Sequence, residues 1–134
     1  VAVGFEQNRL AMLLAVLHRH GGLQVADQDV FINAVGGIRV DETSSDLAVV
    51  LAVISSFRNK ALPQNLICFG EIGLSGEIRP VPNGQERLRE AAKHGFEVAI
   101  VPQANVSKQS IADFQVRGVT CLADAITLID ELAS

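Results

Sequence analysis

The segment of residues 47–57 constrains the fold more than any other, because it has the length of a helix and almost no polar side. A helix that is apolar nearly all round is stable only when protein surrounds it. We therefore expect a helix from Ser45 to about Phe57 at the centre of the domain, as core rather than as a partner surface. Its apolar stripe consists of Leu47, Val50, Leu51, Ile54 and Phe57, with Val49 and Val53 beside it.

Strand-like and helix-like segments alternate along the rest of the chain. Apolar residues recur at helical spacing around residues 10–17, and short β-branched runs end at glycine or proline. This alternation predicts an α/β fold, with α+β character, in which a mixed sheet has helical cover. The expected strands cover residues 1–3, 29–40, 66–72, 77–81, 97–101 and 116–121, and the further helices cover 85–93 and 123–132. The strands at 66–72 and 77–81 are expected to pair as a hairpin through Gly73 and Gly76.

Composition indicates a single domain over residues 1–134. This length is close to that of a typical domain, and 49% apolar residues are enough for a core. The apolar runs are too short to span a membrane and no signal pattern opens the chain, so a cytoplasmic location without membrane contact is expected. The six phenylalanines are expected in the core.

The residues give no pattern for a cofactor. Cys68 and Cys121 lack the spacing of zinc ligands and are expected to be free thiols. His18 and His20 have no third ligand nearby, and no phosphate-binding glycine loop followed by lysine occurs. We therefore predict neither metal nor nucleotide binding for this chain.

Residues 70–88 read GEIGLSGEIRPVPNGQERL. This segment resembles the lysine-bearing active-site segment of Lon-type serine peptidases, with Gln85 at the position of the lysine. In a serine–lysine dyad the amine must accept the proton of the serine hydroxyl. A primary amide has no pKa in the working range and cannot act as a general base. The resemblance therefore implies a degenerate peptidase site without activity.

Residues 41–46, DETSSD, occupy the place of the serine-bearing segment of the same peptidases, and Ser44 falls in register with the nucleophile. The same residues suit a helix N-terminus, because Thr43 and Asp46 have the spacing of a capping box. The cap is the favoured interpretation. The alternative is a vestigial or atypical serine peptidase that uses Ser44 without the usual lysine.

Almost the whole chain resembles the C-terminal, Lon-protease-like domain of the RadA (Sms) family of bacterial DNA repair proteins. The segments that carry the resemblance are 3–14, 35–40, 69–90, 92–96 and 100–102. The resemblance implies a Lon-protease-domain-like fold and a non-catalytic role in DNA repair and recombination. It also implies self-association into a hexameric ring that holds DNA. ATP and zinc are expected only in N-terminal modules that this chain does not contain.

The net charge argues against DNA contact, because 11 basic against 15 acidic residues give −4, the wrong sign for binding phosphates. A local basic face is nevertheless predicted. Gln85, Arg89 and Lys93 recur at helical spacing, with Arg79 on the strand before them. A solvated helix face with ordinary ion pairs is the alternative. Arg9 is expected to be an ordinary surface charge.

Overall fold

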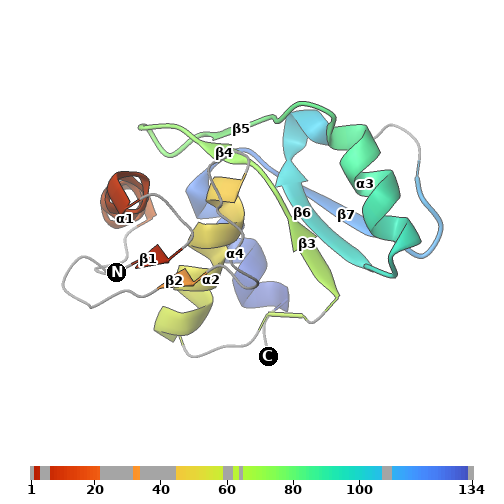
Figure 1. Cartoon of the computed structure of the whole chain (residues 1–134), viewed down its shortest axis with the longest axis horizontal. Helices are drawn as coiled ribbons and strands as arrows, with labels where there is room; N and C mark the ends of the chain where they lie inside the picture. The colour runs from red at the N-terminus through yellow and green to blue at the C-terminus, as the bar shows by residue number, and fades with distance from the viewer. Residues whose placement is uncertain are drawn as a thin grey trace.

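The computed structural model is an α/β structure in which helices cover both faces of a parallel sheet (Figure 1). Its four α-helices, within the described residues, are α1 (Gln7–Gly21), α2 (Asp46–Arg58), α3 (Gly84–Lys93) and α4 (Leu122–Leu132). The residues that the structure describes are 2–3, 7–21, 32–33, 45–58, 62–63, 65–106 and 110–132.

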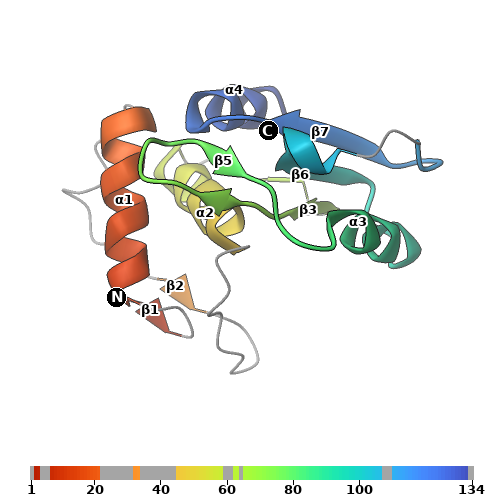
Figure 2. The same ribbon diagram turned by 90° about the horizontal axis from the view of Figure 1, so that it is seen from above.

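The main sheet has the strand order β3 (Leu66–Cys68), β6 (Val98–Pro102), β7 (Gln115–Val119), and all three strands are parallel. Side chains alternate between its two faces, as successive residues of a strand must. Ile100 of β6 joins the core with α2 and α4, whereas its neighbours Ala99 and Val101 join the core with α3. The sheet therefore lies between α2 and α4 on one side and α3 on the other (Figure 2).

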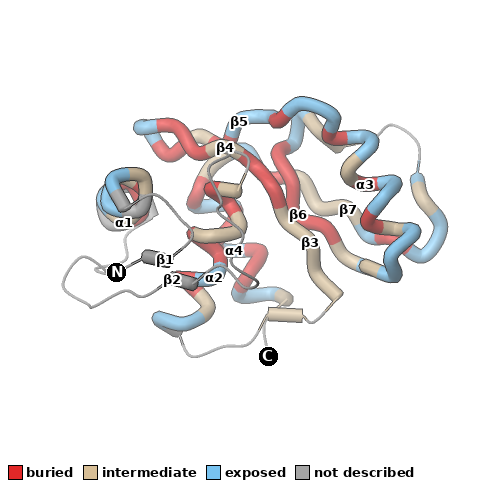
Figure 3. The backbone as a smooth tube through the Cα atoms, in the orientation of Figure 1, coloured by how far each residue is buried: buried red, intermediate tan, exposed pale blue. Residues whose placement is uncertain are grey.

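The expectation for the central helix is confirmed over most of its length. Leu47, Leu51 and Ile54 are completely buried where α2 packs against α1, α4 and the neighbouring strands. The prediction for Phe57 was wrong, because its side chain is 44% exposed. Phe57 lies in the last turn, and Figure 3 shows that this end of α2 is exposed while its middle is covered.

The predicted strand at 66–72 is two strands in different sheets. Its first half, β3, pairs with β6, and only β4 (Glu71–Ile72) pairs antiparallel with β5 (Ile78–Arg79). The chain turns at Gly70, whose φ of 152° favours glycine, and an added Cβ would lie 3.2 Å from the Pro102 side chain. Within the described residues the predicted mixed sheet is therefore a three-stranded parallel sheet and a small antiparallel hairpin. An antiparallel bridge between Glu77 and Cys121 connects the hairpin to the chain that follows β7.

The N-terminal part of the chain contributes a small parallel pair. β1 (Ala2–Val3) pairs with β2 (Ile32–Asn33). The remainder of the strand predicted at 29–40 lies outside the described residues. None of the described helices has the length and apolarity needed to cross a bilayer.

Candidate functional site

The start of α3 carries the residue at the peptidase lysine position. The chain leaves β5 through Pro82 and Asn83, and Asn83 adopts a left-handed conformation with φ 61°. The backbone N–H of Arg87 then donates to the Asn83 carbonyl at 3.0 Å, which closes the first turn. The predicted helix at 85–93 is confirmed, with its first residue one position earlier at Gly84.

Asn105 holds the approach to this helix in place. Its Oδ1 accepts the backbone N–H of Val81 at 2.8 Å, and its Nδ2 donates to the Val81 carbonyl at 3.1 Å. The side chain thus pairs with the backbone as a neighbouring strand would. Gly84 has to be small here, because an added Cβ would lie only 2.4 Å from Asn105 Nδ2.

Gln85 is tied to the same asparagine. Its Nε2 donates to the backbone carbonyl of Asn105 at 3.0 Å, which links α3 to the short helix η4 (Gln103–Asn105). The Gln85 side chain is exposed, and its amide N–H donates to this backbone oxygen. Gln85 therefore has a structural contact that an amide satisfies without any proton transfer. Ser44 and Thr43 lie outside the described residues.

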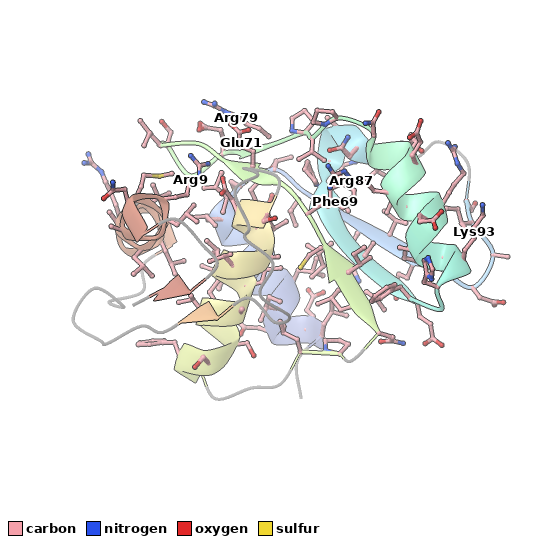
Figure 4. The ribbon with its side chains drawn as sticks, in the orientation of Figure 1. Arg9, Phe69, Glu71, Arg79, Arg87 and Lys93 are labelled. Atoms are coloured by element: carbon pink, nitrogen blue, oxygen red, sulfur yellow. The ribbon has the colours of Figure 1, made fainter. Side chains whose placement is uncertain are left out.

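The predicted basic residues divide between two places. Arg89 and Lys93 are exposed on α3, and neither forms an ion pair or a side-chain hydrogen bond with another described residue. Glu90 on the same helix instead contacts His94, with Oε1 and Nε2 3.0 Å apart. Arg79 lies on the hairpin, well away from Lys93 at the far end of α3 (Figure 4). The structure therefore does not gather all three predicted cations into one patch.

The charge of Arg79 is offset by two carboxylates. Its Nη1 lies 3.6 Å from Glu71 and its Nη2 lies 3.5 Å from Glu77. All three side chains are at least a third exposed, so these pairs contribute little to stability. They do reduce the local positive potential that Arg79 could offer to a phosphate.

Arg87 makes contacts that the sequence did not predict. Its guanidinium lies 5.9 Å from the centroid of the Phe69 ring, and its Nε donates to the Pro82 carbonyl at 3.2 Å (Figure 4). A guanidinium over an aromatic face at this distance is a cation–π contact. Arg87 fastens α3 to the end of β3, so it fixes the orientation of the helix face that carries Arg89 and Lys93.

Arg9 is not the ordinary surface charge that we expected. Its guanidinium forms an ion pair with Asp46, whose side chain is completely buried, and Nε donates to Asp46 Oδ1 at 3.0 Å. The Ile72 backbone N–H also donates to this carboxylate, at 3.1 Å. The ion pair thus joins α1, the first residue of α2 and β4. Asp46, expected in a capping box, serves here in contacts between elements.

The thiols are free and separate from these contacts. Neither Cys68 nor Cys121 forms a disulfide. Burial raises the pKa of the Cys68 thiol to about 12, so it is protonated near neutral pH and is a poor nucleophile. Within the described ranges no three histidine, cysteine, aspartate or glutamate side chains gather as metal ligands.

A comparison with protein families defines the class of this chain. The family model described as subunit ChlI of Mg-chelatase matches residues 2–105. This match covers more than half of the chain. The chain belongs to that family.

Comparison with individual proteins is more specific than the family model. The chain is 67% identical over 132 residues to the DNA repair protein RadA of Haemophilus influenzae and 66% identical over 132 residues to that of Escherichia coli. It is 61% identical over 131 residues to RadA of Pseudomonas aeruginosa. Each match covers 98% of this chain and 29% of the relative, so the chain spans less than a third of the length of these proteins. The resemblance to the RadA family that the sequence predicted is confirmed.

Proposed function

We propose that residues 1–134 form the non-catalytic, Lon-protease-like domain of a longer DNA repair and recombination ATPase of the RadA type. In this role the domain is a scaffold that assembles a hexameric ring and contributes to DNA binding, in the cytoplasm. ATP and zinc bind to other modules of that protein. The proposal is supported by 66–67% identity to two RadA proteins along nearly the whole chain.

The proposal that this domain is non-catalytic rests on one observation, the hydrogen bond of Gln85. Its amide donates to the Asn105 carbonyl, at the position where the resemblance implies a lysine. A glutamine in this contact cannot accept the proton of a serine hydroxyl, so it supplies no general base. The residue instead connects α3 to the turn that follows β6.

The peptidase alternative has a direct test. We expect the chain not to cleave unstructured peptides or react with a serine-directed fluorophosphonate. We expect Gln85→Lys to react no faster, because restoring the amine does not rebuild the rest of the site. Labelling or cleavage that disappears in Ser44→Ala would contradict the proposal and support the serine peptidase alternative.

For DNA contact, the geometry favours α3 over the hairpin. Arg89 and Lys93 are exposed and form no ion pair with another described residue, whereas Arg79 is paired with Glu71 and Glu77. Phosphate binding requires cations whose charge is not already offset nearby. We therefore narrow the proposed DNA-binding residues to Arg89 and Lys93, with Arg79 as a minor contributor.

Fluorescence anisotropy with duplex DNA across a salt series tests this assignment. We expect Arg89→Glu/Lys93→Glu to weaken binding and to flatten the salt dependence by about two phosphate contacts. Arg79→Glu is the matched control and should change binding less. Absence of binding at low salt would contradict DNA contact by this domain and leave ring assembly as its proposed role. An equal loss in both variants would contradict the preference for α3.

A further inference from the structure

Asn83 and Gly84 form the only asparagine–glycine step in the sequence. Asparagine is one of the chemically labile residues of proteins. The backbone nitrogen of the next residue can attack its side-chain amide, and glycine hinders this attack least because it has no side chain. The other asparagines are all followed by a residue with a side chain; they are Asn8, Asn33, Asn59, Asn65 and Asn105. Residues 83 and 84 are therefore the most reactive such pair by chemistry alone.

The Asn83 side chain is not held by the start of the helix that it precedes. Asn83 is exposed, and it makes no side-chain capping hydrogen bond within the described structure. Asn105 differs, because its Oδ1 and Nδ2 both bind the Val81 backbone. Asn83 therefore presents its amide to solvent, whereas the amide of Asn105 is fixed in place.

The backbone of the folded chain opposes the reaction. Asn83 has φ 61° and ψ 30°, the left-handed conformation that asparagine adopts more readily than most residues. At this ψ the Gly84 nitrogen is nearly anti to the Asn83 Cβ across the Cα–C bond, so it lies on the side away from the carbon that it would attack. The reaction therefore requires a large rotation about that bond.

Contacts at the start of α3 resist this rotation. The Asn83 carbonyl accepts the Arg87 N–H at 3.0 Å, and the rotation would turn this carbonyl away from its donor. Gly84 is buried against Asn105, where an added Cβ would lie only 2.4 Å from Asn105 Nδ2. The reactive conformation is therefore reached only when the first turn of α3 opens, a local opening that is smaller than unfolding of the chain.

We propose that Asn83 is a site of spontaneous deamidation whose rate is controlled by opening of the first turn of α3. In the opened turn the Gly84 nitrogen bonds to Asn83 Cγ and the Cγ–Nδ2 bond breaks. The proton of the Gly84 nitrogen passes through solvent to the departing amide nitrogen, which leaves as ammonia. Water then opens the resulting succinimide ring. Breaking the new bond leaves aspartate, and breaking the original peptide bond leaves isoaspartate. This proposal does not depend on the function proposed above.

The two products differ in their effect on α3. Aspartate also adopts the left-handed conformation, and its negative charge is favourable before a helix N-terminus. Isoaspartate lengthens the main chain by one carbon, so the carbonyl that accepts the Arg87 N–H is displaced. We therefore expect isoaspartate, but not aspartate, to loosen the helix that carries Arg89 and Lys93.

Peptide mapping by mass spectrometry tests whether Asn83 reacts and whether the fold controls the reaction. The chain is incubated in mildly alkaline buffer, either native or unfolded in guanidinium chloride, and fragment ions assign each exchange of NH₂ for OH to a residue. We expect Asn83 to react faster than every other asparagine in the unfolded chain, and about tenfold or more slowly in the native chain. Equal rates in the two states, or a faster reaction at another asparagine of the unfolded chain, would overturn the proposal.

Two variants distinguish local opening from unfolding of the whole chain. Asn105→Ala removes the hydrogen bonds to Val81 beside α3 and should speed native-state deamidation of Asn83 by about tenfold. Arg9→Met is the control, because the ion pair with Asp46 stabilises the chain far from α3 (Figure 4). It should leave the rate unchanged. Equal acceleration by both variants would show that the reaction requires unfolding of the whole chain, and it would overturn control by α3.

A milder variant protects the test against misfolding of Asn105→Ala. Gln85→Ala removes only the hydrogen bond from the exposed Gln85 amide to the Asn105 carbonyl. It should remain folded by circular dichroism and speed the reaction by a smaller factor. A rate that neither variant changes overturns the proposal.

The products provide a separate readout. The isoaspartate form, isolated by chromatography, should unfold at a lower temperature than Asn83→Asp, which has the same charge and an unaltered main chain. Equal midpoints would contradict the loosening of α3.

Discussion

The ion pair between Arg9 and Asp46 makes a quantitative prediction about stability. Arg9→Met removes the guanidinium and leaves a carboxylate that is completely buried in the folded chain. Losing one partner of a buried ion pair typically costs about 3–5 kcal/mol, because the remaining charge is neither hydrated nor compensated. Here the Ile72 N–H remains as a donor, and Arg9 is 27% exposed, so water can enter its place. We therefore expect a loss of about 3 kcal/mol, at the lower end of that range.

Urea unfolding followed by circular dichroism measures this loss as a change in the unfolding free energy. For 134 residues the unfolding entropy converts about 3 kcal/mol into a decrease in Tm of roughly 10 °C. Arg79→Met is a matched control, because it removes the same guanidinium from two partly exposed carboxylates. It should change the unfolding free energy by less than about 1 kcal/mol.

A double-mutant cycle isolates the interaction itself. Asp46→Asn retains an oxygen for the Ile72 N–H but removes the charge that Arg9 compensates. The double variant Arg9→Met/Asp46→Asn should therefore be more stable than the sum of the two single losses, by about 1 kcal/mol or more. The reasoning is refuted if the losses are additive, or if Arg9→Met costs no more than Arg79→Met.

Three further predictions concern other contacts. Asn105→Ala should cost about 1–3 kcal/mol in urea unfolding, because both the N–H and the carbonyl of Val81 lose their partner; an unchanged midpoint would contradict the role assigned to this side chain. The raised pKa of Cys68 means that the unfolded chain loses a proton above its ordinary thiol pKa, whereas the folded chain keeps it until about pH 12; stability should therefore fall as pH rises through this window, and Cys68→Ala should reduce the slope. The Thr120 hydroxyl donates to Asp124 at 2.7 Å and, together with the backbone N–H, lowers the pKa of that carboxyl, so its stabilising effect is present above the ordinary aspartate pKa and is lost as pH falls through the folded value. An NMR titration should show the Asp124 midpoint move upward in Thr120→Val, and an unmoved midpoint would exclude the hydroxyl as the main cause.

Local patterns were sufficient where one segment determines its own structure. The helix at 85–93 follows from its polar face and from the glycines at both ends, and the structure displaces only its first residue. The apolar segment 47–57 predicted a buried helix, since only the interior of the domain keeps so many apolar side chains away from water. The strands at 97–101 and 116–121 were also located from their own residues, and the structure places β6 and β7 there within two residues.

Predictions that depend on neighbours were less successful. Residues 66–72 looked like one strand because period and composition continue across Gly70, yet the two halves pair with different partners. Arg9 and Asp46 are 37 positions apart, so nothing local marks them as partners. Asn105 and Val81 are 24 positions apart, so no local pattern shows that the Asn105 side chain holds the approach to α3.

The sequence by itself determined the alternation of helices and strands, the buried central helix and the membership of the RadA family. It also determined that residue 85 is an amide, which fixes what that side chain can do with a proton. Only the tertiary structure decided that Gln85 holds a backbone carbonyl, that Arg79 is offset by two carboxylates, and that Phe57 remains exposed. The physical reason is that chemical type belongs to a residue, whereas burial and partners are set by segments that are distant in the chain and meet only on folding.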